Sequence, residues 1–166
     1  AESSTGIRVS GNNNTINNFD TISIDQGSTG IRVSGDNNTI NHYGTINMKE
    51  GGGVSIGIVL AGEDGEKNTI NHYGRTIVGD DEDIAISSSG SGEDTVNLFS
   101  GSEIIGDIML RDGDDTINAY AGSQTTGDID FGGGDDTMNY HLGARTEGRI
   151  DLGADTDTAN IFGSNT

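Results

Sequence analysis

A tripeptide of Thr, an apolar residue and Asn recurs seven times along this chain, and it constrains the fold more than any other sequence feature. The copies are Thr15-Ile16-Asn17, Thr39-Ile40-Asn41, Thr69-Ile70-Asn71, Thr95-Val96-Asn97, Thr116-Ile117-Asn118, Thr137-Met138-Asn139 and Thr158-Ala159-Asn160. Successive copies lie 24, 30, 26, 21, 21 and 21 residues apart. Self-similarity at a period of roughly 20 to 50 residues is typical of repeat architectures, in which one short unit stacks on the next. We therefore expect about seven stacked units.

Short β-strands are predicted on both sides of each tripeptide. Upstream of each copy, apolar residues stand two positions apart, as in Ile7/Val9, Ile31/Val33, Ile58/Leu60, Ile84/Ile86, Ile108/Leu110, Ile129/Phe131 and Ile150/Leu152. Alternation with a period of two residues predicts a strand. Downstream of the first three copies, another strand is predicted over residues 21–24, 45–48 and 75–78. In the later units this third side shortens towards a Gly-Ser-x-x-x-Gly pattern.

Two or three short strands per unit predict an all-β fold, a single-stranded parallel β-helix (β-solenoid) of about seven coils of 21–30 residues, forming one domain over residues 1–166. This architecture also accounts for the composition, because Ile, Val, Leu and Phe supply only 35 of 166 residues while the net charge is −19. For a chain with a broad core, that combination borders on disorder. A narrow solenoid needs only about two inward apolar residues per strand, and its backbone hydrogen bonds run between coils.

The charge and the apolar runs exclude several partners. With 27 Asp and Glu against 8 Lys and Arg, the surface repels nucleic acid and anionic membranes. The longest apolar run, Ile56 to Ala61, is far shorter than the roughly 20 residues of a membrane-spanning helix, so no membrane insertion is expected. The chain has no Cys, which excludes disulfides and thiol chemistry.

The repeat resembles the passenger repeats of bacterial autotransporters in two stretches, Gly30-Ile-Arg-Val-Ser-Gly-Asp-Asn-Asn-Thr-Ile-Asn-His-Tyr-Gly-Thr-Ile46 and Gly127-Asp-Ile-Asp-Phe-Gly-Gly-Gly-Asp-Asp-Thr-Met-Asn139. The resemblance extends over nearly the whole chain. It implies a right-handed β-helix displayed outside the outer membrane, and therefore an extracellular or bacterial cell-surface location. Repeats of this kind specify a fold more than an activity.

The residue before each Thr is Asn in the first three copies and Asp in the last four. We call these seven residues the Asx row: Asn14, Asn38, Asn68, Asp94, Asp115, Asp136 and Asp157. Stacked coils place the four carboxylates about 4.8 Å apart, where like charges repel and need compensation. Gly90-x-Gly92-x-Asp94-x-Val96 and Gly132-x-Gly134-x-Asp136-x-Met138 resemble part of the calcium-binding nonapeptide of RTX proteins, which implies Ca²⁺ along this row as a possible cofactor. The alternative is a turn cap that hydrogen-bonds local backbone, a role that Asn and Asp serve equally well.

Aromatic residues recur two positions after the repeated Asn, at Phe19, Tyr43, Tyr73, Phe99, Tyr120 and Phe162, and His141 takes this place in the sixth unit. A stack of such rings is either part of the core or an exposed stripe that binds carbohydrate or another surface. Polar residues precede the ring in the first three units, which favours an inward ring, whereas Leu98 and Ile161 favour the opposite phase. The sequence leaves both orientations open.

If the central residue of each tripeptide points inward, its Thr and Asn neighbours form an outward Thr-x-Asn face across all seven coils. One interpretation is structural, with hydroxyl and amide ladders that satisfy one another between coils. The alternative is ice binding, because flat arrays of Thr on β-solenoids bind ice in antifreeze proteins.

Enzymatic activity is not expected. Right-handed β-helices include polysaccharide lyases and hydrolases, which work within walls of long loops. Here the insertions are short acidic or Gly/Ser bulges at Lys49 to Ser55, Gly62 to Lys67, Gly79 to Asp83 and Ser87 to Gly90, too small to build a substrate cleft. His42 and His72 fall in register on adjacent coils without a nucleophile placed beside them.

The two ends of the chain are in phase with the repeat. Joining Thr166 of one copy to Ala1 of the next gives a Thr-to-Thr interval of 23 residues, within the observed range. Contacts of this kind that do not close produce filaments. The sequence therefore predicts a non-enzymatic, extracellular structural or adhesive solenoid, either a surface-fibre building block that stacks head to tail or an autotransporter passenger segment. An adhesin that binds a host or surface ligand through a side face is the alternative.

Overall fold

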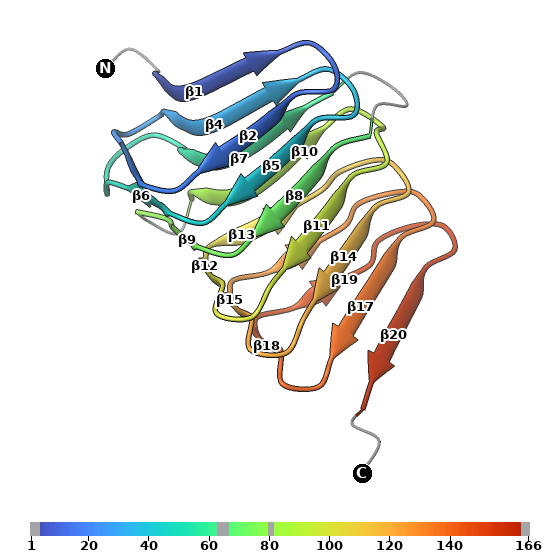
Figure 1. Cartoon of the computed structure of the whole chain (residues 1–166). Helices are drawn as coiled ribbons and strands as arrows, with labels where there is room; N and C mark the ends of the chain where they lie inside the picture. Colours follow the sequence, from blue (N-terminus) through green and yellow to red (C-terminus); the bar gives the residue numbers. More distant parts are fainter. Residues whose placement is uncertain (1–3, 63–66, 80–81, 164–166) are drawn as a thin grey trace.

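In the computed structural model, which describes residues 4–62, 67–79 and 82–163, the chain winds into a stack of parallel strands (Figure 1). The first sheet contains β1 (Thr5–Ser10), β4 (Thr29–Ser34), β7 (Ile56–Ala61), β10 (Ile84–Ser89), β13 (Asp107–Met109), β16 (Ile129–Asp130) and β19 (Ile150–Asp151). The second contains β2 (Thr15–Asn18), β5 (Thr39–His42), β8 (Thr69–His72), β11 (Thr95–Leu98), β14 (Thr116–Ala119), β17 (Thr137–His141) and β20 (Thr158–Phe162). The third contains β3 (Thr21–Ile24), β6 (Thr45–Met48), β9 (Arg75–Ile77), β12 (Glu103–Ile105), β15 (Gln124–Thr126) and β18 (Arg145–Glu147).

The predicted parallel β-solenoid is confirmed, and each coil contributes one strand to each sheet. The described residues make six complete turns, and a seventh turn has two sides only, because the third sheet has six strands and the other two have seven. The third side shortens in the later coils, as expected, from the four residues of β3 and β6 to strands of three residues. No helix among the described residues is long and apolar enough to cross a membrane.

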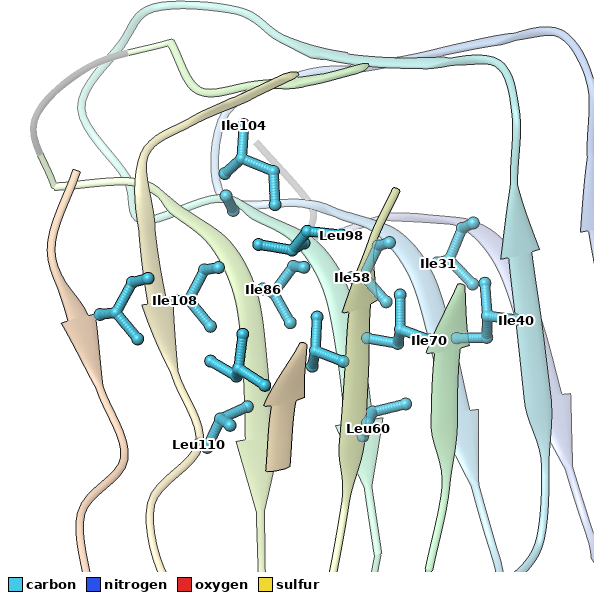
Figure 2. Close-up of a cluster of buried hydrophobic side chains, with 14 of the residues drawn as sticks. Ile31, Ile40, Ile58, Leu60, Ile70, Ile86, Leu98, Ile104, Ile108 and Leu110 are labelled. Carbon is cyan, nitrogen blue, oxygen red and sulfur yellow. The ribbon is translucent and has the colours of Figure 1, made fainter. Parts of the chain in front are cut away.

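Strand register follows the sequence repeat. In the second sheet, Thr pairs with Thr and Asn with Asn from one coil to the next, as in Thr39↔Thr69 and Asn41↔Asn71. The central apolar residue of the tripeptide points inward, so Ile40, Ile70 and Ile117 are fully buried. Inward residues of all three sheets meet along the axis, with Ile31 and Ile108 from the first sheet and Ile104 from the third (Figure 2).

One predicted bulge is wrong. The stretch Ser87 to Gly90 was expected to be a small insertion, but Ser87, Ser88 and Ser89 are the final residues of strand β10. They pair with Val59, Leu60 and Ala61 of β7, respectively. Parts of the predicted bulges at Gly62 to Lys67 and Gly79 to Asp83, and the chain-end residues 1–3 and 164–166, lie outside the described residues.

Candidate functional site

The Asx row lies where the chain enters the second sheet, and it ties successive coils together. From Asn38 onwards, the side-chain Oδ1 of each of the six members accepts a hydrogen bond from the backbone N–H of the row member one coil earlier, at 2.7–3.1 Å. The expected cap of local backbone is therefore mainly a bond between coils. Asn and Asp serve it equally, because each supplies an acceptor oxygen.

The Asn and Asp members of this row differ in the hydrogen bonds of their second polar atom, which is Nδ2 in Asn and Oδ2 in Asp. Asn14 and Asn38 donate their Nδ2–H to the Oδ1 of the next member, at 3.0 and 3.1 Å. Asp94 Oδ2 accepts a 2.5 Å hydrogen bond from Ser88 Oγ. The Oδ2 atoms of Asp115 and Asp136 are buried and have no hydrogen-bond partner among the described residues. A carboxylate in that position lacks the donors that would stabilise its charge.

Burial consequently disfavours the charged form of these carboxyl groups. Burial raises the pKa of Asp115 to about 8, and the neighbouring charges of Asp94 and Asp136 act in the same direction. The pKa of Asp136 rises to about 6, again mainly through burial, with smaller contributions from other acidic residues including Asp157. The backbone N–H bond to each group opposes the shift. At neutral pH Asp115 therefore retains its proton.

The calcium prediction gains no geometric support from the described residues, in which no group of three or more His, Cys, Asp or Glu side chains is arranged to hold a metal ion. The Asp94, Asp115 and Asp136 side chains are buried, and the Oδ1 atom of each already accepts a hydrogen bond from a backbone N–H group. Ca²⁺ prefers six to eight converging oxygen ligands, and the row offers its carboxylates one coil at a time.

The aromatic residues form a continuous stack on the outside of the solenoid. Consecutive rings, from Phe19 through Tyr43, Tyr73, Phe99, Tyr120 and His141 to Phe162, have centroids 4.2–5.0 Å apart and lie within 23° of parallel. Phe19 is 73% exposed, and the preceding residues Asn18, His42 and His72 point inward. The orientation that the sequence left open is thus outward. Because each ring covers the face of the next, only ring edges are presented along the side, whereas a sugar ring stacks on a free aromatic face.

The inward polar residues form their own chain of contacts. Asn18 Nδ2 lies 3.0 Å from His42 Nδ1, and His42 Nε2 lies 2.9 Å from the carbonyl oxygen of Arg75. A carbonyl only accepts, so Nε2 donates and Nδ1 accepts, which makes His42 neutral. His72 Nε2 bonds Thr76 Oγ1 at 2.9 Å, while its Nδ1 has no partner among the described residues. Burial lowers the pKa of both rings, for His72 to about 3. These histidines are buried core groups with no access to a substrate.

On the Thr-x-Asn face the amides, but not the hydroxyls, satisfy one another. Each Asn Nδ2 donates to the Oδ1 of its neighbour at 2.7–2.9 Å along Asn17, Asn41, Asn71, Asn97, Asn118, Asn139 and Asn160. The other row of the face contains Thr15, Thr39, Thr69, Thr95, Thr116, Thr137 and Thr158, whose hydroxyls make no hydrogen bond within the described residues. This face therefore has one internally bonded row and one row of free hydroxyls.

The C-terminal end of the stack exposes the interior of the solenoid. Because the seventh turn has only two sides, a pocket of about 360 Å³ opens there, lined by Met138, Tyr140, Ile150, Leu152, Ala159, Asn160 and Ile161. Ile161 is 81% exposed although its position faces the core in earlier coils, where Leu98 is buried. Sequence analysis placed the ends in phase but missed this apolar surface, which alignment of the inward positions would have located.

The outer surface of the first sheet carries a gradient of charge. Its central row, which we call the outer row, contains Arg8, Arg32, Val59, Ser87, Met109, Asp130 and Asp151 in successive register. It begins with two arginines at the N-terminal end and finishes with two aspartates at the C-terminal end. Sequence analysis did not detect this row, because its members become comparable only when the coils are superposed.

The chain matches no known protein-family model, and neither curated proteins nor solved structures gave a match. Function is therefore argued from the surfaces described above.

Proposed function

We propose that this chain is a non-enzymatic structural solenoid of the bacterial cell surface that stacks head to tail into fibres. The observation that carries the proposal is the open C-terminal end, where apolar interior and strand edges are exposed together. Unpaired strand edges invite pairing with another chain, and the pocket beside Ile150 and Ile161 has the same character as the buried core of earlier coils.

The first coil of a second copy fits this end. At the N-terminal end β1, β2 and β3 each have one neighbour among the described strands, and they carry inward apolar residues that include Ile7, Val9 and Ile22. A parallel coil placed on β19 and β20 continues the hydrogen-bond pattern of the first and second sheets. Phe19 of the added copy then extends the aromatic stack beyond Phe162.

Charge favours the same direction of stacking. Continuing the outer row across the junction places Arg8 of one copy beside Asp151 of the other. Opposite charges in register favour the head-to-tail pairing, whereas tail-to-tail contact would bring Asp151 against Asp151. The net charge of −19 opposes association at low ionic strength, so assembly is expected to increase with salt.

The extracellular location, and the role of an autotransporter passenger segment, are supported only by the resemblance of the repeat. Both agree with a rod whose stability depends on ladders of repeated contacts rather than on a ligand.

Sedimentation velocity and negative-stain electron microscopy over a range of protein and salt concentrations test the proposal. We expect filaments of rod width in the unmodified protein, and their loss in Ile161→Lys, because a charge then enters the junction. Val54→Lys is the matched control, since Val54 is also exposed but lies on a side loop. Arg8→Asp and Asp151→Arg should each weaken assembly, and the double variant should restore it.

Monomeric rods at every protein and salt concentration would contradict stacking. Filaments formed equally well by Ile161→Lys would show that the junction lies elsewhere.

Ice binding is a second candidate, favoured by the row of Thr hydroxyls on the second sheet that make no hydrogen bond with the described residues. Thermal hysteresis of the purified protein that disappears in a Thr95→Tyr, Thr116→Tyr double variant would support it. Absence of hysteresis in the unmodified protein would eliminate it.

A further inference from the structure

A groove on the side of the rod departs from the repeat. It lies over strands β4, β7 and β10 and the turns that follow β10 and β13, and its volume is about 480 Å³. Val59 and Ser87 form its floor and are only 5% and 6% exposed. Arg32 and Arg111 line it from opposite ends. Strands β7 and β10 lie between β4, which carries Arg32, and β13, which precedes Arg111, so the groove spans about 14 Å of sheet.

The arginines of this groove are free cations in an acidic protein. Five of the basic residues form ion pairs with carboxylates: Lys49, Lys67, Arg75, Arg145 and Arg149. Arg8, Arg32 and Arg111 make no ion pair with any described residue. Two of these three line the groove, where Asp112 is the one acidic side chain among the described lining residues. The groove therefore carries an excess of positive charge on a chain of net charge −19.

Arg111 occupies a backbone position that the repeat otherwise gives to glycine. Gly11, Gly35, Gly90, Gly132 and Gly153 stand at the same point of their coils, each with φ between 92° and 106°. Arg111 adopts φ 78° at this point. A non-glycine residue in this region is strained, and such strain is concentrated at functional sites. Arg111 thus holds a backbone conformation that glycine would adopt without strain.

We propose that the groove between Arg32 and Arg111 binds an acidic saccharide, with the two guanidinium groups contacting carboxylate or sulfate groups of the ligand. Guanidinium groups form strong, often bidentate hydrogen bonds with such anions. The serine hydroxyls match the hydroxyl groups of a sugar: Ser89 is exposed, and Ser87 donates to the carbonyl of Ser88 and keeps its oxygen available as an acceptor. Val59 and Ile56 offer a small apolar surface to the C–H face of a sugar ring.

The charge of the whole chain limits the class of ligand. Long polyanions of high charge density are repelled by the acidic rod, whereas an oligosaccharide with widely spaced anionic groups loses little. The site lies on the side of coils two to five, so it stays accessible when rods are stacked. The inference therefore goes beyond the proposed fibre function and does not depend on it.

Titration of the full chain with three tetrasaccharides tests the proposal, with amide chemical shifts of Ser87, Ser88 and Ser89 as the readout. The probes are a glucuronate-containing hyaluronan fragment, a sulfated chondroitin fragment and neutral cellotetraose. We expect the acidic probes to shift these amides with a Kd that rises as NaCl is added. The ratio of the two acidic affinities identifies carboxylate or sulfate as the preferred group.

Arg111→Gly is the decisive variant, because it restores the residue of the repeat and is not expected to impair folding. It should weaken acidic binding about tenfold or more, as should Arg32→Gln. Arg145→Gln, which alters an arginine on the third sheet, should leave the Kd unchanged. Equal binding of cellotetraose, equal binding of inorganic sulfate, unchanged affinity in Arg111→Gly, or no shift with millimolar acidic probe would each overturn the proposal.

Discussion

The first three coils and the last four use different side chains, Asn and Asp respectively, to accept the same backbone N–H hydrogen bond between coils. In both regions an Asx residue accepts a backbone N–H from the coil before it, as Asn68 does for Asn38 and Asp136 does for Asp115. In the first region Asn14 and Asn38 also donate from Nδ2 to the next member, so Asn38 uses both its polar atoms within the row. In the second, carboxyl oxygens remain buried without partners. The fold thus requires an acceptor at this position, and burial disfavours a negative charge there, most strongly at Asp115.

The two regions also differ at the next inward position of the second sheet. His42 and His72 occupy it in the early coils, and Leu98 and Ala119 occupy it later. Burial shifts the histidines and the aspartates in opposite senses, because each group is held in its neutral form. Two halves of one rod are therefore expected to respond to pH in opposite directions.

Replacing Asn by Asp in the Asx row of the early coils should have the largest effect on the free energy of unfolding. Asn38→Asp removes the Nδ2–H bond to Asn68 and buries a charge, so we expect the free energy of unfolding to fall by about 3 kcal/mol at neutral pH. Urea unfolding measures this. Asn14→Asp, in the more exposed first coil, is the matched control and should lose less. Equal losses at both positions would contradict the role of burial.

The reverse exchange should stabilise the later coils. Asp115→Asn supplies an Nδ2–H for the Oδ1 of Asp136, as Asn14 does for Asn38, and should raise the free energy of unfolding by about 2 kcal/mol near neutral pH. Asp157→Asn should have little effect, because Asp157 is only half-buried. Destabilisation by Asp115→Asn would show that the protonated carboxyl makes a contact that an amide cannot replace.

Acidification should stabilise the later coils, which contain Asp115, and destabilise the early coils, which contain His72. The folded pKa of Asp115, about 8, exceeds its unfolded value of 3.8, so its contribution to stability is complete below about pH 4 and is lost as the pH rises to about 8. The folded pKa of His72, about 3, lies below its unfolded value of 6.5, so its contribution is complete above about pH 6.5 and is lost as the pH falls towards 3.

Hydrogen-exchange protection factors, corrected for intrinsic rates, measure this opposition. Between about pH 7 and pH 5, we expect protection to increase at Ile117 and Met138 and to decrease at Ile40 and Ile70. Local differences are observable because each coil of a solenoid contacts only its neighbours. A change of the same sign in both halves would contradict the comparison.

The smallest effect is expected at a turn that both halves share. Arg111→Gly should raise the free energy of unfolding by about 1 kcal/mol, because glycine adopts a positive φ without strain. The control is Arg32→Gln, which should change the free energy of unfolding little. Glycine is not used at this position, because Arg32 lies within strand β4, where glycine would itself destabilise the fold. Thermal unfolding of the two variants checks the difference.

Much of the fold was predictable because the repeat aligns its own residues. The seven tripeptides predicted the second sheet, and their apolar centres predicted its inward face, as Ile40 and Ile117 confirm. The third side was harder, because Gln124–Thr126 and Arg145–Glu147 lack apolar alternation and pair through their backbones. Ser87 to Gly90 was misjudged for the same reason, since serine is not typical of strands.

Sequence by itself determined the coil, its period and the residues that stack in each row, because identical spacing places identical positions above one another. Only the tertiary structure decided which rows face water. Alternation with a period of two continues through the second sheet to its corner, so Ile40 and His42 point inward and Tyr43 points outward with the other aromatic residues. The polar character of His42 favoured the opposite phase, but its buried ring hydrogen-bonds the carbonyl oxygen of Arg75 from another part of the chain. Stacking likewise brings Arg32 and Arg111 to one groove and leaves Asp115 Oδ2 without a hydrogen-bond donor among the described residues, because these relations join residues that lie far apart in the chain.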